Sequence, residues 1–182
     1  VYKRQLEANP NDASPHAMEG WASAGVNRLS IGIQSFSDKG LELLGRDHSA
    51  AQAITTARTA PRFFNSVSLD LIYAWPGQTR QEWERDLETA LSLKAPHLSL
   101  YELTIEERTA FGKAAARGTL IPKADDEQAD FYELTQAICT AAGLPAYEVS
   151  NHAAAPPYQS VHNHIYWNSG DWIGVGLSLI HI

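Results

Sequence analysis

Cysteine is nearly absent from this sequence of 182 residues, which contains only Cys139. A single cysteine excludes an internal disulfide and is typical of a reducing compartment, so we expect a cytoplasmic location. Long apolar runs are also absent, which argues against a membrane-spanning helix, and the N-terminus lacks the pattern of a signal peptide. Basic residues number 14 against 21 acidic ones, for a net charge of −7 without a Lys/Arg cluster. We therefore expect no binding to nucleic acid.

The two ends of the chain are interpreted separately from the rest. The first five residues, VYKRQ, match the translation of a transposon mosaic end used in DNA library preparation, and the last six, LSLIHI, match the translation of its reverse complement. We interpret residues 1–5 and 177–182 as adapter translations and leave them out of the fold prediction. Residues 6–176 are then natural sequence truncated at both ends. A hydrophobic content of 44% over the whole chain indicates a globular core.

Helical and strand patterns alternate over the first 105 residues. The first helical pattern begins at Ser14 and Pro15, a favourable N-cap and first helical residue, and stops at Gly25. A second, alanine-rich pattern covers residues 50–60. Such alternation is typical of a parallel α/β sheet, either closed into a barrel or open and doubly wound, and periodicity does not choose between the two. Buried strands are predicted at residues 28–33, 67–73 and 97–101.

The helix predicted between the second and third strands is amphipathic. Trp83, Leu87, Ala90 and Leu91 recur at the i, i+4, i+7, i+8 spacing of one apolar stripe. This stripe is expected to pack on the sheet. The residues predicted on the opposite, polar side are Glu82, Arg85, Asp86 and Glu88.

The pattern changes after residue 105. A loop leads into a helix predicted at residues 125–142, whose apolar face carries Phe131 and Leu134. A short strand is predicted at residues 146–149, and an aromatic segment follows at residues 162–172. This part of the chain is therefore expected to form a region distinct from the alternating α/β part.

Functional residues in a parallel α/β sheet gather at the carboxyl ends of the strands. Gln34 follows the first predicted strand, Asp70 lies within the second and Thr104 comes after the third, while Glu7 would end an earlier strand. A carboxylate among apolar residues is costly to bury unless it accepts hydrogen bonds or meets a cation, which makes Asp70 the strongest candidate. A structural carboxylate that caps a loop is an equally common explanation. Arg46 by itself reads as a surface residue.

Histidine and aromatic residues gather at residues 162–167. His162 and His164 flank Asn163, and Tyr166 and Trp167 follow them. Histidine ligates metals and haem iron, and neighbouring aromatic rings can stack on a porphyrin. Packing combined with a hydrogen bond is the more common role for such residues.

Seven motifs carry a family resemblance when they are taken in order. They are EANP (7–10), GVNRLSIGIQSF (25–36), LLGRDH (43–48), VSLDLIYAWPGQT (67–79), HLSLYELTIE (97–106), YEVSNHA (147–153) and HNHIYW (162–167) with DWIGVG (171–176). Together they resemble the oxygen-independent coproporphyrinogen oxidase-like group of radical-SAM proteins and, within it, the HemW-type haem chaperones.

The resemblance implies a fold and a set of cofactors. The fold is α/β: the C-terminal part of a partial (β/α)6 radical-SAM barrel at residues 6–105, followed by a small α+β C-terminal region at residues 106–176. The cofactors of the full-length protein are S-adenosylmethionine (SAM) and a [4Fe–4S] cluster. The cluster cysteines are missing from this sequence, so we expect no metal ligand here and no radical chemistry by this chain alone. The residues implied to line the SAM site are Glu7, Gln34, Arg46, Asp70 and Thr104.

Two functions share this implied scaffold. The details of the motifs favour a haem chaperone, which binds haem and transfers it to an acceptor protein. His162 is then the candidate haem contact, with Tyr166 and Trp167 beside the porphyrin. Any contact with a membrane-bound acceptor would be peripheral. The alternative is an oxygen-independent coproporphyrinogen III oxidase, an enzyme that decarboxylates propionate side chains by radical chemistry during haem biosynthesis.

Overall fold

The computed structural model describes residues 4–171, so the predictions for residues 1–3 and 172–182 lie outside the described part. That excluded part contains all of the proposed C-terminal adapter segment and most of the motif at residues 171–176. The described chain is an α/β structure around one five-stranded sheet with the strand order β1-β2-β3-β4-β5. The α/β fold class expected from the sequence is therefore confirmed.

The sheet is mixed, because four strands are parallel and one edge strand is antiparallel. β1 (Gln5–Ala8), β2 (Arg28–Gln34), β3 (Ser66–Tyr73) and β4 (His97–Glu102) pair in parallel. β5 (Asn151–Ala153) comes from the predicted C-terminal region and pairs antiparallel with β4. The two parts of the chain thus contribute to the same sheet.

Four α-helices connect the parallel strands, and three more follow β4 in the described part of the chain, which ends at residue 171. The longer connecting helices begin at side-chain caps: Ser14 accepts from the amide of Ala17, and Ser49 and Thr79 each form a capping box. The connecting helices are α1 (Pro15–Ser23), α2 (Asp38–Leu43), α3 (Ala50–Thr59), extended by η1 (Ala60–Arg62), and α4 (Arg80–Ser92). The later helices are α5 (Ala110–Ala116), α6 (Asp125–Ala141), η2 (Pro156–Tyr158) and α7 (Val161–Trp167).

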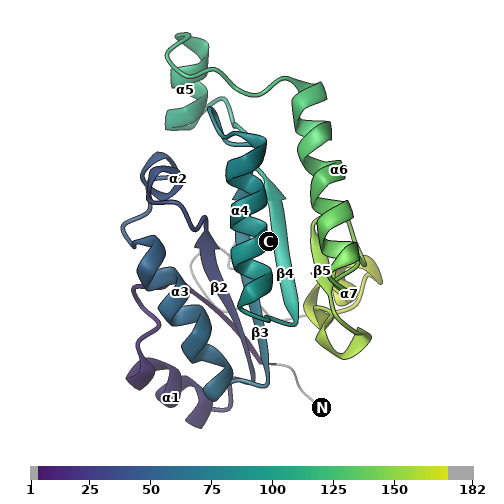
Figure 1. The fold of residues 1–182 in the computed structure, drawn as a ribbon. Helices are drawn as coiled ribbons and strands as arrows, with labels where there is room; N and C mark the ends of the chain where they lie inside the picture. Colours follow the sequence, from purple (N-terminus) through teal and green to yellow (C-terminus); the bar gives the residue numbers. More distant parts are fainter. Residues whose placement is uncertain (1–3, 172–182) are drawn as a thin grey trace.

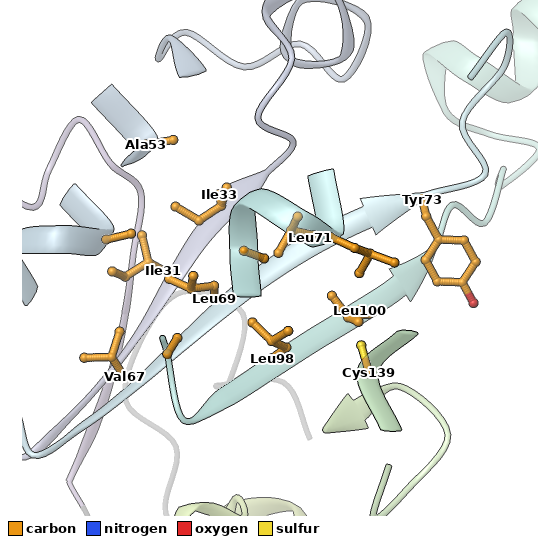
Figure 2. Close-up of a cluster of buried hydrophobic side chains, with 14 of the residues drawn as sticks. Ile31, Ile33, Ala53, Val67, Leu69, Leu71, Tyr73, Leu98, Leu100 and Cys139 are labelled. Carbon is orange, nitrogen blue, oxygen red and sulfur yellow. The ribbon is translucent and has the colours of Figure 1, made fainter. Parts of the chain in front are cut away.

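One face of the sheet forms the hydrophobic core. Figure 1 shows α3 and α4 lying over this face, with α6 beside α4. Figure 2 shows side chains from β2, β3 and β4 pointing into this layer, among them Ile31, Leu69 and Leu98. Cys139 of α6 is buried in the same cluster, and burial raises the pKa of its thiol to about 12. The strands predicted at residues 28–33, 67–73 and 97–101 and the apolar stripe of α4 are therefore confirmed.

Two expectations about local structure are wrong, and two short helices were not expected. The strand predicted at residues 146–149 is reduced to an isolated bridge from Ala146 to His152, and the strand itself is β5. The short helices α2 and α5 were not predicted. Asp86 was placed on the polar side of its helix, yet its side chain is buried and accepts hydrogen bonds from Ser35 Oγ (2.6 Å) and the amide of Phe36 (3.0 Å). These two donors from the loop after β2 explain how a carboxylate is tolerated there.

Candidate functional site

The second face of the sheet is polar, because side chains alternate along each strand. Residues at every second position of β1–β4 point away from the helices and line a cavity of about 170 Å³. The cavity is closed on one side by β5 and by the start of α7. Its lining comprises Gln5, Glu7, Arg28, Ser30, Asp70, His97, Ser99, Tyr101, Asn151, Ser160, His162 and Asn163.

Asp70 is held at the centre of this polar face by serine hydroxyls. Ser30 Oγ donates to both carboxylate oxygens at 3.0 and 2.8 Å, and Ser68 Oγ lies 3.0 Å from Oδ1. Burial raises the pKa of Asp70 above its ordinary value, the hydrogen bonds from the serines oppose this, and the nearby charge of Glu7 raises it further. Two carboxylates thus share one partly enclosed polar surface, which suits a ligand with hydroxyl or ammonium donors.

A chain of hydrogen bonds joins Asp70 to the C-terminal region. Ser68 Oγ lies 2.8 Å from Nδ1 of His97, and Nε2 of His97 lies 2.8 Å from the hydroxyl of Tyr147. The same hydroxyl accepts from the amide of Ser160, the N-cap residue of α7, at 3.0 Å. Side-chain hydrogen bonds therefore fix the position of the first turn of α7 relative to the polar face.

Arg28, the first residue of β2, lines the cavity at the start of the strand. Its guanidinium donates to Gln5 Oε1 (2.9 Å), Ser66 Oγ (2.8 Å) and the carbonyl oxygen of Tyr158 (3.0 Å). Burial lowers its pKa, while the hydroxyl of Tyr147 and the carboxylate of Asp70 oppose that change. Since its donors are engaged in joining strands to the segment before α7, Arg28 has a structural role.

Helix α7 carries the histidine and aromatic residues outward from the sheet. His162 faces the cavity and meets the ring of Tyr166 edge-on, with ring centroids 4.5 Å apart. Trp167 is 72% exposed, and its indole Nε1 donates to Glu148 Oε2 at 2.5 Å. A groove of about 410 Å³ runs beside these rings. The groove lining comprises Tyr101, Glu148, Val149, Ser150, Asn151, Asn163, Tyr166 and Trp167.

The structure brings together some of the residues singled out in the sequence and separates others. Glu7, Asp70 and His162 line the same cavity, and Tyr166 and Trp167 line the adjoining groove. The two spaces share Tyr101, Asn151 and Asn163 as a common wall. The residues predicted to contact haem and two of the residues predicted to contact SAM therefore lie in adjoining spaces, although they come from different motifs.

Gln34 lies next to this site without lining the cavity. It has a positive φ of 66° after a register shift in β2, a conformation that is uncommon for a residue other than glycine. Its side chain folds over Gly32, where an added Cβ would lie 2.8 Å from Nε2 of Gln34 and 3.4 Å from Oδ1 of Asn9. Glycine at position 32 thus leaves room for the Gln34 amide on the polar face.

Arg46 and Thr104 are not brought to the cavity within residues 4–171. Arg46 follows α2, its amide donates to the carbonyl oxygen of Leu41, and its Nε is buried with no hydrogen-bond partner. Thr104 lines a separate pocket of about 220 Å³ with Lys123 and Gln128. The SAM roles of these two residues stay predictions that the described cavity does not support.

Several residues of the site were missed by sequence reasoning. Ser30, Ser68, Ser99 and His97 were passed over because each strand was interpreted as a continuous apolar run. The signal was present as strict alternation, as in RLSIGIQ and HLSLYE, where every second residue is polar or glycine until the strand end. Glu148 had no such signal, because it lies in a loop and its role depends on three partners in β5 and α7.

Comparisons with known proteins agree with this architecture. The Radical SAM superfamily profile matches residues 2–90. The chain is 42% identical to the heme chaperone HemW of Escherichia coli (strain K12) and 38% identical to that of Lactococcus lactis, in each case over 94% of this chain. It is 43% identical to the mitochondrial radical S-adenosyl methionine domain-containing protein 1 of Bos taurus, again over 94% of this chain. The chain spans 39–45% of the length of these relatives.

Two solved structures have the same fold. Coproporphyrinogen III oxidase (HemN) from Escherichia coli superimposes with a TM-score of 0.74 at 22% identity, covering 83% of this chain and 35% of that chain. The archaeal Elp3 of Methanocaldococcus infernus superimposes with a TM-score of 0.67 at 19% identity, covering 75% of this chain and 33% of that chain. At these identities the likeness concerns the fold alone.

Proposed function

Because this chain belongs to the radical SAM superfamily, we propose that it is the part of a HemW-type haem chaperone that contacts haem and one side of SAM. In this proposal the full-length protein binds haem, transfers it to an acceptor protein and works in the cytoplasm. The lone, buried Cys139 suits such a reducing compartment. Within residues 4–171, no helix is long and apolar enough to cross a membrane.

The observation that carries the haem proposal is the exposed aromatic surface of α7. A soluble protein rarely presents a tryptophan as exposed as Trp167 beside a second exposed ring, Tyr166, and a groove of about 410 Å³. Planar aromatic ligands stack on such rings, and His162 supplies an imidazole next to Tyr166. The similarity to proteins named heme chaperone supports the same ligand.

The polar face fits part of SAM. Asp70 and Glu7 offer carboxylate oxygens for the hydroxyl and ammonium groups of SAM, and Gln34 offers an amide close to Gly32. SAM supplies a sulfonium group that radical-SAM proteins cleave. Ser30 and Ser68 orient the Asp70 carboxylate by hydrogen bonding.

This chain does not fit a [4Fe–4S] cluster. Such clusters are held by several cysteine thiolates, whereas the sequence has one cysteine, Cys139 of α6, which is buried in the core. Cluster binding is therefore assigned to residues of the full-length protein outside this sequence.

Haem binding is tested by titrating ferric haem into the chain and following the Soret absorption. We expect saturable binding, and we expect His162→Ala to weaken it by about 10-fold or more and to change the spectrum. His16→Ala is the matched control, because His16 is an exposed histidine in α1, away from the groove. An unchanged affinity and spectrum in His162→Ala would remove His162 from the proposal, and a wild-type chain without saturable binding would contradict haem binding itself.

Turnover separates the chaperone from the oxidase. The full-length protein, reconstituted anaerobically with its cluster, is supplied with coproporphyrinogen III, SAM and a reductant. We expect no conversion under conditions in which a known oxidase is active. Conversion to protoporphyrinogen would replace the chaperone with an oxidase.

A further inference from the structure

Helix α7 is too short and too exposed to hold its own position. It has seven residues, and none of them is buried. Isolated helices of this length are unstable in water, so tertiary contacts have to fix the direction of its side chains. The Tyr147 hydroxyl fixes the N-cap residue Ser160, and the carboxylate of Glu148 holds side chains of the helix itself.

Glu148 accepts hydrogen bonds from three side chains in two elements. Oε2 accepts from Nε1 of Trp167 at 2.5 Å, and Oε1 accepts from Nδ2 of Asn163 at 2.6 Å and from Nδ2 of Asn151 in β5. Hydrogen bonds to an ionised acceptor are stronger than those between neutral groups. The carboxylate thus ties both ends of α7 to the antiparallel edge of the sheet.

We propose that Glu148 is the positioning residue of the haem surface: it fixes the Trp167 ring as a stacking platform and holds Asn163 in the wall between groove and cavity. This inference rests on the proposed function. Glu148 acts through the residues that it holds, and its own carboxylate is occupied by their donors. The groove therefore presents a pre-oriented aromatic face to a planar macrocycle.

The arrangement lowers the entropic cost of binding. An exposed tryptophan normally loses rotamer freedom when a ligand orders it, at a cost of about 0.5–1.5 kcal/mol for each immobilised side chain. Trp167 has its indole edge attached to Glu148 before any ligand arrives, while the ring remains 72% exposed. Asn163 is ordered in the same way, so two side chains at the groove are arranged in advance.

The first experiment measures ferric haem affinity of Glu148→Gln in the whole chain. Glutamine keeps the size of the side chain but replaces one acceptor oxygen by an amide donor. This donor opposes either the indole N–H of Trp167 or the amide N–H groups of Asn163 and Asn151, which bond to the other oxygen. We expect the affinity to fall by about 10-fold, because one pre-ordered side chain is released and the other loses its charged acceptor. Glu133→Gln is the control, because it removes the same charge from an exposed position on α6. Wild-type affinity in Glu148→Gln would overturn the inference and leave the proposed function intact.

A second readout does not depend on haem. In protein labelled with 15N at tryptophan, the indole resonance that Trp167→Phe removes belongs to Trp167. We expect Glu148→Gln to move this resonance and to speed its exchange with water, while the indole resonances of the buried Trp75 and Trp83 stay in place. An unmoved Trp167 resonance would overturn the positioning role. A shifted resonance in a protein that binds no haem would support the positioning and contradict the haem proposal alone.

Discussion

The imidazole of His97 and the phenol of Tyr147 are in direct hydrogen-bond contact, with 2.8 Å between Nε2 and the hydroxyl oxygen. His97 begins β4, whereas Tyr147 lies in the loop before β5, 50 residues later in the chain. The hydroxyl also accepts from the amide of Ser160. One phenol therefore joins the polar face of the sheet to the N-terminus of α7.

Removing that hydroxyl is expected to destabilise the C-terminal region. Tyr147→Phe keeps the ring but leaves His97 and the amide of Ser160 without this partner, at a cost of about 1–3 kcal/mol in the free energy of unfolding. Urea unfolding measures the change. Tyr132→Phe removes a hydroxyl from an exposed ring on α6 and is expected to alter stability by less than about 0.5 kcal/mol. Equal stabilities for the two variants would mean that the His97–Tyr147 contact is not formed in solution.

The titration of Asp86 is expected to make stability depend on pH. Burial raises the pKa of Asp86 from 3.8 to about 6, against the hydrogen bonds from Ser35 and Phe36. Between about pH 4 and pH 6 the folded state then holds more protons than the unfolded state. The free energy of unfolding therefore falls as the pH rises through this range, by up to about 3 kcal/mol for this group.

Asp86→Asn removes this titration and tests the prediction. Urea unfolding at pH 4 and pH 7.5 is expected to show a fall in the free energy of unfolding for the wild-type chain. The fall is expected to be smaller in the variant, which retains only the contribution of other buried carboxyls such as Asp70. Asp130→Asn, at an exposed position of α6, is expected to keep the wild-type dependence. Parallel pH profiles for wild type and Asp86→Asn would show that Asp86 ionises at its ordinary pKa.

Much of the fold could be predicted because it follows from local chemistry. The capping residues Ser14 and Thr79 mark helix starts through contacts within one turn, and the stripe through Trp83 and Leu87 needs only helical spacing. The polar face was also readable in principle, since the alternation around Ser30 and Asp70 has the period of a strand that is polar on one side. The runs are only seven and eight residues long, and their apolar residues outweigh this alternation.

Other features depend on partners that the sequence does not place. Asp86 belongs to the polar side of α4 by spacing alone, and only the loop after β2 supplies the donors that let it be buried. Glu148 stands between Tyr147 and Val149 with no local pattern, yet its partners lie 3, 15 and 19 residues away. The site residues Glu7, Asp70 and His162 come from separate motifs. That they line one cavity follows from the order of the strands in the sheet, which the motifs alone do not give.

The contact between α4 and α6 is expected to depend on a buried hydrogen bond. Trp83 Nε1 donates to Oγ1 of Thr135 at 2.8 Å, and both side chains are buried. Thr135→Val keeps the shape and leaves the indole N–H unsatisfied, so we expect a loss of about 1–3 kcal/mol in the free energy of unfolding. Thr140→Val is the control, because it makes the same substitution at an exposed position of the same helix and so measures the effect of helix propensity alone. A loss of the same size in both variants would assign the effect to the helix and contradict a role for the Trp83 contact.

The polar face is expected to bind SAM through Asp70. Its carboxylate is oriented by Ser30 and Ser68, and removing the charge leaves one acceptor oxygen for the donors of SAM. Hydrogen bonds to charged groups contribute about 1.5–3 kcal/mol, so Asp70→Asn is expected to weaken SAM binding by about 10- to 100-fold. Saturation-transfer NMR with SAM measures this, with Asp130→Asn as the matched control and S-adenosylhomocysteine as a ligand without the sulfonium charge. Equal signals from wild type and Asp70→Asn would place SAM elsewhere. A ligand bound in this cavity has to contact the Asp70 carboxylate, which two serines orient toward the cavity.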